Sequence, residues 1–143
     1  MADKIIQLKD QNGNNLYPLS TNLRPTDYIS QCTTTNFSLD SSSYLLKFPN
    51  GLVVFYLQGI NTAQFQTGGA NFLQIPYSDF IFPGSGGYMF FAGTNPWATA
   101  ACNFALYADR TNSKLYFRAY PLANRAANTR FDVAGCYFAS EEE

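Results

Sequence analysis

The sequence predicts an all-β protein built as an antiparallel β-sandwich of the jelly-roll kind. Three observations favour this fold class. Short apolar or alternating runs recur along the chain, turns rich in Gly, Asn and Pro separate them, and no segment keeps helical periodicity beyond about one turn. A length of 143 residues suits one such domain.

The predicted strands of the sandwich begin where the composition changes, at Tyr44. They occupy residues 44–48, 52–60, 72–76, 88–92, 100–108, 114–120 and 131–139. Pro49, Asn50 and Gly51 form a tight turn between the first two strands. The run 114–120 alternates, so it should bury one face, that of Leu115, Phe117 and Ala119, and expose the other.

The residues before the sandwich divide into two parts. Residues 1–20 are predicted to form an arm that attaches the protein to a particle or to another subunit. Its strand 4–9 is followed by an Asn-Gly turn and the segment 16–19. An isolated hairpin is marginal in water, so its apolar residues need a partner surface: Ile5, Ile6, Leu8, Leu16, Tyr17 and Leu19. Residues 21–43 read as a polar linker or irregular strands, 44–140 as the head and 141–143 as an acidic tail.

The composition excludes several classes of function. Charged residues are only 13% of the chain and the net charge is −1, which argues against nucleic acid and anionic membranes as partners. No apolar run is long enough for membrane insertion. The chain has no His, the commonest general base and metal ligand, and no cluster has metal-ligand spacing. We therefore expect neither a metal nor another cofactor.

Three cysteines, Cys32, Cys102 and Cys136, are too few and too irregularly spaced for a disulfide framework. Cys102 and Cys136 lie in apolar runs and are expected to be buried free thiols. The N-terminus lacks the apolar core of a signal peptide. Together these features predict assembly in a cytosol.

The aromatic content predicts an oligomer. The chain has 13 Phe, 10 Tyr and 1 Trp, more than a sandwich of this size is expected to bury. Apolar surface that remains outside a core tends to form subunit contacts. We therefore expect a homo-oligomer held together by its heads.

The candidate binding residues are aromatic and amide-bearing. Trp97, in the loop 94–99, could stack on a sugar ring or fold into a core or subunit contact. Tyr116 and Tyr120 on the polar face of residues 114–120 could line a groove or pack at an interface. Asn124, Arg125 and Asn128 offer hydrogen bonds to a glycan or belong to a solvated loop.

Catalysis has little support in the sequence. Asp79 and Asp132 could form a carboxylate pair of the glycosidase kind, but their surroundings are unrecognisable and solvation in a turn or loop is the favoured interpretation of both. We predict that the protein is not an enzyme.

Two segments resemble a known family. Lys9-Asp10-Gln11-Asn12-Gly13-Asn14-Asn15-Leu16-Tyr17-Pro18 resembles the arm K-D-x-x-G-N-x-x-Y-P that begins many bacteriophage fibre and baseplate proteins. Pro49-Asn50-Gly51-Leu52, the run 72–82 with Pro76, and the closing strand Phe131-Asp132-Val133-Ala134-Gly135-Cys136-Tyr137 are similar to the C-terminal domain of phage tail fibres.

The resemblance implies a trimeric β-sandwich head on a virion, assembled in the host cytoplasm. Its arm would bind other virion proteins, and its loops would bind a host-surface glycan or protein. The chain departs from long tail fibres because it has no shaft. The alternatives are a capsid decoration or head-fibre protein, a glycan-degrading enzyme that uses Asp79 or Asp132, and a cellular lectin or adhesin.

Overall fold

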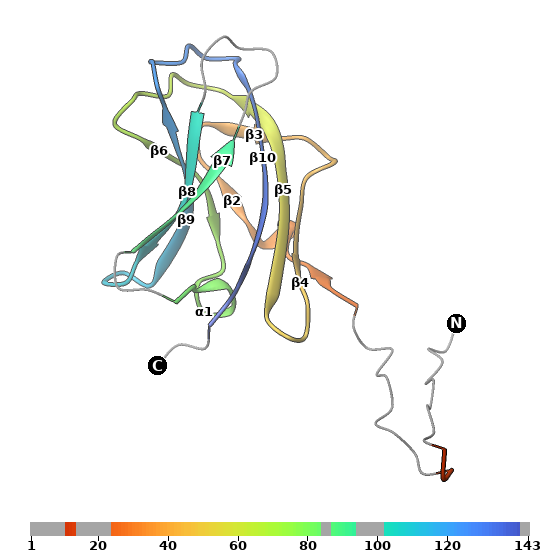
Figure 1. The fold of residues 1–143 in the computed structure, drawn as a ribbon. Coiled ribbons are helices and arrows are strands. Elements are labelled where there is room, and N and C mark those ends of the chain that lie inside the picture. The colour runs from red at the N-terminus through yellow and green to blue at the C-terminus, as the bar shows by residue number, and fades with distance from the viewer. Residues whose placement is uncertain (1–10, 14–23, 84–86, 94–101, 141–143) are drawn as a thin grey trace.

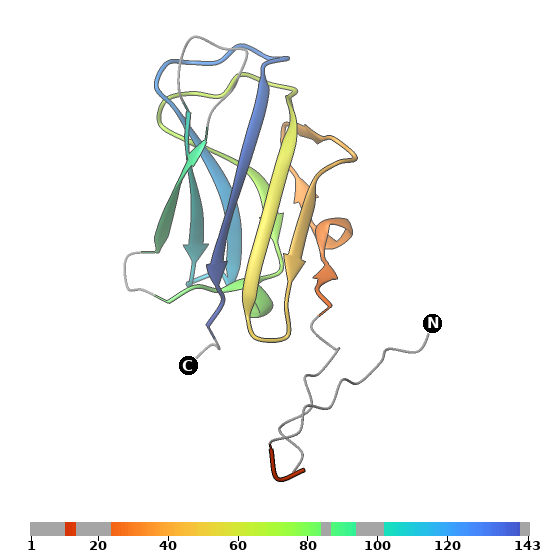
Figure 2. The ribbon, with the colours of Figure 1, turned by 45° about the vertical axis from the view of Figure 1, so that its right-hand side comes forward.

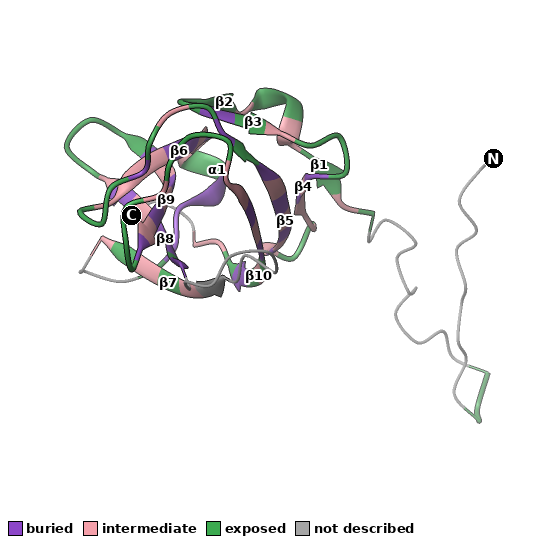
Figure 3. Cartoon of the chain, turned by 90° about the horizontal axis from the view of Figure 1, so that it is seen from above, coloured by how far each residue is buried: buried purple, intermediate pink, exposed green. Residues whose placement is uncertain are grey.

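Two antiparallel sheets packed face to face make up the protein (Figure 1). The computed structural model describes residues 11–13, 24–83, 87–93 and 102–140. Every strand pair in these residues is antiparallel. Seen from above, the two layers enclose the buried segments between them (Figure 3). The predicted fold class, an antiparallel β-sandwich, is confirmed.

The first sheet has the order β1-β4-β5-β10, and β3 also pairs with β5. Its strands are β1 (Thr26–Asp27), β3 (Phe37–Leu39), β4 (Tyr44–Lys47), β5 (Leu52–Asn61) and β10 (Arg130–Phe138). The β4–β5 hairpin turns at Gly51, whose φ of +88° suits a residue without a Cβ. The predicted tight turn at Pro49, Asn50 and Gly51 therefore lies where the sequence placed it.

The second sheet has the order β2-β6-β9-β8-β7. Its strands are β2 (Thr33–Thr34), β6 (Ala70–Ile75), β7 (Tyr88–Gly93), β8 (Cys102–Asp109) and β9 (Lys114–Pro121). The neighbours β6-β9-β8-β7 form a Greek key, because the first of four consecutive strands lies beside the last. Two short helices complete the described elements: the 3-10 helix η1 (Ile29–Gln31) and α1 (Tyr77–Phe80).

The core is filled mainly by phenylalanine. Nine phenylalanines of the described residues are buried between the sheets: Phe37, Phe55, Phe65, Phe72, Phe80, Phe82, Phe104, Phe117 and Phe131. Phe55 contacts Phe91 edge-on and Phe117 at a tilt, with ring centroids 4.9 and 4.7 Å apart. Gly135 of β10 makes room for these rings, since a Cβ there would lie 2.8 Å from Phe55 and 2.9 Å from Phe91.

The sheets begin earlier in the chain than Tyr44, where the sequence placed the start of the head. Strands β1, β2 and β3 lie within the segment expected to be a polar linker or irregular strands, and they pair with β4, β6 and β5. Phe37 in this segment is buried in the core. Strands of two or three residues are too short to show an alternating pattern, so the sequence left both a polar linker and irregular strands open for this segment.

The cysteines follow the alternation of their strands. Cys102 is buried, as expected, whereas Cys136 is exposed, so the expectation of a buried thiol there is wrong. Cys136 lies opposite Val54 of β5, on the face of the sheet turned away from the core. Residues 133–136 are all small or apolar, so no polar residue in the sequence indicated which of them faces outward.

The two ends of the sandwich differ. Ala139 donates its N–H to Gly51 O, and Ser140 donates its N–H to Ile81 O, at 2.9 and 2.8 Å. Strand β1 begins beside Lys47. Residues 24 and 140, which bound the described head, therefore lie near the turn 48–51, and the loops 62–69 and 122–129 lie at the opposite end (Figure 2).

Candidate functional site

The outer face of the second sheet carries a cluster of aromatic residues. We call it the aromatic face and define it by Tyr88, Phe90, Tyr107, Tyr116, Arg118 and Tyr120. Strand register builds it, because residues directly opposite each other share a face of the sheet. Tyr116, Tyr107 and Tyr88 form one row across β9, β8 and β7, while Arg118, Ala105 and Phe90 form the next.

Alternation in β9 places two of the predicted residues on this face. Leu115, Phe117 and Ala119 are fully buried, so the outward positions are Tyr116, Arg118 and Tyr120, all half-buried. The predicted alternation of residues 114–120 is confirmed. The small Ala105 of β8 is covered from outside as well as inside, with 0% of its surface exposed.

The rings on this face stack on one another. Tyr88 stacks on Tyr107 with centroids 4.8 Å apart, and Tyr107 stacks on Tyr116 at 6.3 Å. Each of these contacts occupies one ring face, which a sugar would otherwise use for stacking. Phe90 is the most accessible ring of the cluster, with 65% of its surface exposed. The face therefore offers ring edges, hydroxyl groups and one open apolar ring.

Arg118 anchors the cluster to the loop 62–69. Its guanidinium lies over the rings of Tyr107 and Tyr120, at 6.0 and 5.4 Å from their centroids. It donates to Asn71 Oδ1 at 2.9 Å and to Gly68 O at 3.2 Å. Burial raises the pKa of Tyr120, and the nearby Arg118 charge partly opposes that rise. This phenol therefore stays neutral at physiological pH and can donate a hydrogen bond.

The other predicted binding residues lie in the loop 122–129, which is joined to the loop 62–69. Phe65 and Arg125 exchange backbone hydrogen bonds of 2.9 and 2.8 Å, as in a β-bridge. Asn124 Oδ1 accepts the N–H of Thr67 at 3.1 Å. Asn128, at a φ of +66°, donates its N–H to Asn61 O. These three predicted residues, Asn124, Arg125 and Asn128, thus hold the two loops together.

Asn61 is the residue of this region that the sequence did not single out. Its side chain has 0% exposure and donates to Ala63 O and Ala126 O at 2.9 Å each. It also accepts the N–H of Thr129 at 2.6 Å. The sequence signal that could have identified Asn61 was its position at the end of an apolar strand, directly before a polar loop.

The structure brings the predicted residues into two adjoining groups. Tyr120 belongs to the aromatic face and lies against Gly69 of the joined loops, where an added Cβ would approach its ring to 2.8 Å. Tyr116 lies further along β9. Tyr88, Phe90 and Tyr107 were not predicted, because only the strand register reveals that they share a face with Tyr116. Alternation in β9 already placed Arg118 on that face, although it was not named as a binding residue. Trp97 and the arm residues Ile5, Ile6, Leu8, Leu16, Tyr17 and Leu19 lie outside the described residues.

The two aspartates proposed as a carboxylate pair do not form one. The Asp79 carboxylate lies 3.9 Å from Lys47 Nζ, and Lys47 pairs with Val53 of β5. The Asp132 carboxylate lies 3.6 Å from Arg130 Nε, and Asp132 pairs with Gln58 of β5. Positions 53 and 58 are about 17 Å apart along a strand, well beyond the spacing of glycosidase carboxylates. Each carboxylate thus has a different cation as its neighbour, and these positions give no support to the proposed carboxylate pair.

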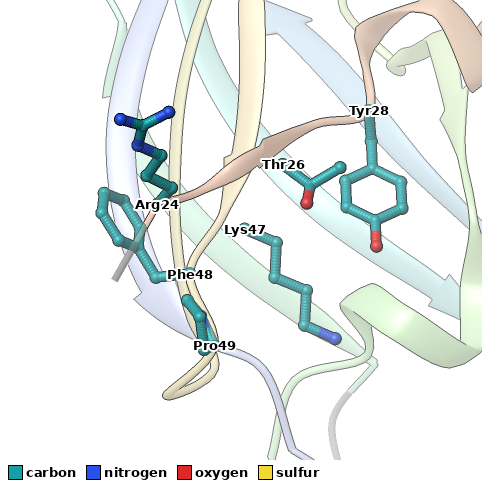
Figure 4. A pocket seen from close by; sticks show the side chains of 6 residues that line it. All are labelled: Arg24, Thr26, Tyr28, Lys47, Phe48 and Pro49. Carbon is teal, nitrogen blue, oxygen red and sulfur yellow. The ribbon is translucent and has the colours of Figure 1, made fainter. Parts of the chain in front are cut away.

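Two hollows that described residues line lie at the other end of the sandwich. One of about 270 Å³ is lined by Arg24, Thr26, Tyr28, Lys47, Phe48 and Pro49 (Figure 4). Lys47 Nζ points toward α1 and lies 5.7 Å from the centroid of the Phe80 ring. Nothing in the described part of the chain groups three potential metal ligands of the His, Cys, Asp or Glu type. Its helices are also too short to cross a membrane.

Comparisons with known proteins give one structural likeness. No family model matches the sequence, and no curated protein matches it. The distal domain of the mouse adenovirus 2 fibre is similar to this chain with a TM-score of 0.42 and 10% identity, over 99% of each chain. That score is below the level at which a shared fold is established, so the fold assignment rests on the strand pairing described above.

Proposed function

We propose that the protein is a non-enzymatic structural protein of a bacteriophage virion, a fibre head or receptor-binding tip. The observation that carries this proposal is the polarity of the sandwich. The described head begins and ends beside the turn 48–51, whereas the joined loops 62–69 and 122–129 lie at the far end. A head held at one end by an arm presents its other end outward.

The arm is the proposed point of attachment to other virion proteins. Residues 1–20 precede the first strand of the head, and their apolar side chains require a surface to lie against. Their resemblance to the arms of phage fibre and baseplate proteins supports this role. The virion is accordingly the proposed location, after assembly in the host cytoplasm.

The aromatic face and the joined loops are the proposed contact with a host-surface glycan or protein. Tyrosine and arginine are the residues that most often dominate binding energy at interfaces. Phe90 and Tyr88, with 65% and 44% of their surfaces exposed, are the accessible part of the cluster. In a homotrimer three such sites would act together, so weak single contacts would give strong overall binding.

Competition for adsorption tests this function. Purified protein should inhibit adsorption of the phage to its host. The double variant Tyr88→Ser, Phe90→Ser should need about tenfold more protein for half-inhibition, because the loss at each site is multiplied by multivalent binding. Lys114→Ala, exposed at the end of the same sheet, is the matched control and should inhibit like the wild type. Tight binding to empty capsids without any effect on adsorption would identify a capsid decoration protein instead.

A further inference from the structure

Besides the aromatic face, the outer face of the first sheet is a second surface on which apolar side chains gather. We call it the uncharged face and define it by Leu46, Leu52, Val54, Ala134, Cys136 and Phe138. These residues alternate with buried ones such as Leu45, Val53 and Tyr137, so they point away from the core. Register sets Leu52 opposite Phe138, and sets Val54 between Leu46 and Cys136.

Charged side chains lie at the margins of this sheet, at the end of the joined loops and on the edge strand β1. Arg130 lies 3.9 Å from Asp40 and 3.6 Å from Asp132, and these three residues lie toward the joined loops. Toward the other end, the rows through Leu52 and Val54 carry no charged side chain on β4, β5 and β10, and Asp27 of the edge strand β1 lies opposite Leu46 at their margin. Tyr44 and Tyr56, with ring centroids 5.9 Å apart, lie between the two regions. An apolar centre with a polar margin is the usual anatomy of a protein interface.

The dimensions of the face suit the centre of a subunit contact. Three strands and three outward rows cover about 300 Å², from the ordinary spacing of strands and residues. A stable interface covers about 800 Å² on each partner, so the residues around these three rows, including the charged margin, would supply the remainder. Phe138 has 60% of its surface exposed and is the most accessible large apolar side chain of this face.

The absence of charge on this face identifies a second copy of the chain as its occupant. Near a rotation axis each residue approaches its own copies, so a charged residue there would meet like charges. On β4, β5 and β10 the rows through Leu52 and Val54 avoid this repulsion, with Asp27 at the edge of the sheet, whereas the aromatic face has Arg118 at its centre. The small Ala134 and Cys136 let two sheets approach closely.

We infer that copies of this chain pack around a symmetry axis through the uncharged face. This inference rests on the proposed function, which requires several copies of the chain, and it specifies the surface through which they pack. It leaves the aromatic face and the joined loops free for a receptor. With the axis parallel to the strands of the first sheet, the beginning of each described head, at Arg24, lies near the same end of the assembly, where a set of arms would attach together.

Cys136 is a built-in reporter for this contact. It is the exposed thiol among the three cysteines, and burial raises the pKa of both Cys32 and Cys102 to about 12. Those two thiols should therefore react slowly with a maleimide at neutral pH. Labelling of the full chain, followed by mass spectrometry of its peptides, measures the accessibility of Cys136 alone.

The experiment combines this labelling with light scattering after size exclusion. The wild type should be an oligomer in which Cys136 reacts about tenfold or more slowly than in the variant Phe138→Lys, because reaction requires dissociation. Phe138→Lys should be a folded monomer by circular dichroism. Leu46→Lys tests the same face from another strand. Phe90→Lys, on the aromatic face, is the matched control and should remain an oligomer with a protected Cys136.

The outcomes separate this inference from the proposed function. An oligomer with a rapidly labelled Cys136, unaffected by both lysine variants of the uncharged face, would overturn the assigned contact and leave the proposed function standing. If Phe90→Lys were the only variant to dissociate the oligomer, the subunit contact would lie on the aromatic face, and this result would also overturn the assignment. A monomeric wild type at micromolar concentration would overturn both the contact and the multivalent binding, whereas failure of adsorption competition alone affects only the receptor role.

Discussion

Asn61 shows how a single buried polar residue organises one end of the protein. Its amide group satisfies two carbonyl groups and one N–H from the loops on either side of it, all without contact with water. A buried amide is tolerated only when its hydrogen bonds are made, and here all its strong donors and its acceptor have partners. The residue therefore links the loop 62–69 to the loop 122–129.

Replacing Asn61 by Ala should lower the free energy of unfolding by about 3 kcal/mol, because Ala63 O, Ala126 O and Thr129 N–H would lose their partner. Urea denaturation measures the change. Gln64→Ala, exposed in the same loop, is the control and should leave the stability unchanged. Equal stabilities of the two variants would show that the loops are joined without Asn61.

At the scale of elements, α1 closes the end of the sandwich near residues 24 and 140. It is only one turn long, so it depends on tertiary contacts rather than on its own hydrogen bonds. Phe80 is fully buried and meets the Tyr28 ring edge-on, with centroids 4.9 Å apart. The hydroxyl of Tyr137 on β10 donates to Phe80 O at 2.7 Å. The helix thus joins η1 and β10 across the two sheets.

The variant Tyr137→Phe should be less stable by about 1.5 kcal/mol at neutral pH, because Phe80 O stays buried without its donor. Burial also raises the pKa of Tyr137 above its ordinary value. This contribution is fully present below the unfolded pKa of about 10 and is lost as the pH rises beyond it, because the unfolded state then ionises. Denaturation at pH 7 and pH 11 should show the variant losing less stability than the wild type. A parallel loss in both proteins would contradict this assignment.

At the scale of the whole molecule, two non-polar faces lie on opposite sides of one core. Alternation along β5, β9 and β10 builds both, since each strand sends every second residue inward. The aromatic face holds an arginine and stacked tyrosines, and the uncharged face holds aliphatic residues, small residues and Phe138. This difference is the reason for assigning the first to a receptor and the second to copies of the chain.

Removing residues 1–20 should leave a folded, oligomeric head that no longer joins the virion. The core of the described residues is built from Tyr28 onward, so the head retains its packing without the arm. Circular dichroism and light scattering test the first part, and incorporation into particles tests the second. Unfolding of the truncated head, or its dissociation into monomers, would show that the arm belongs to the core or to the subunit contact.

The sequence by itself determined the fold class and most of the long strands. Alternation and turn residues are local signals, so β4, β5, β9 and β10 could be located without knowledge of their partners. The same local signals predicted which residues of β9 face outward, and hence that Tyr116 and Tyr120 share a face.

Only the tertiary structure decided which residues meet across strands and loops. The aromatic face depends on the register of β7, β8 and β9, and the roles of Asn61 and Asn124 depend on contacts between residues more than fifty positions apart. The exposure of Cys136 and the separation of Asp79 from Asp132 are likewise set by long-range pairing. Local pattern gives no information on such pairing, because the same alternation is compatible with many arrangements of strands in a sandwich.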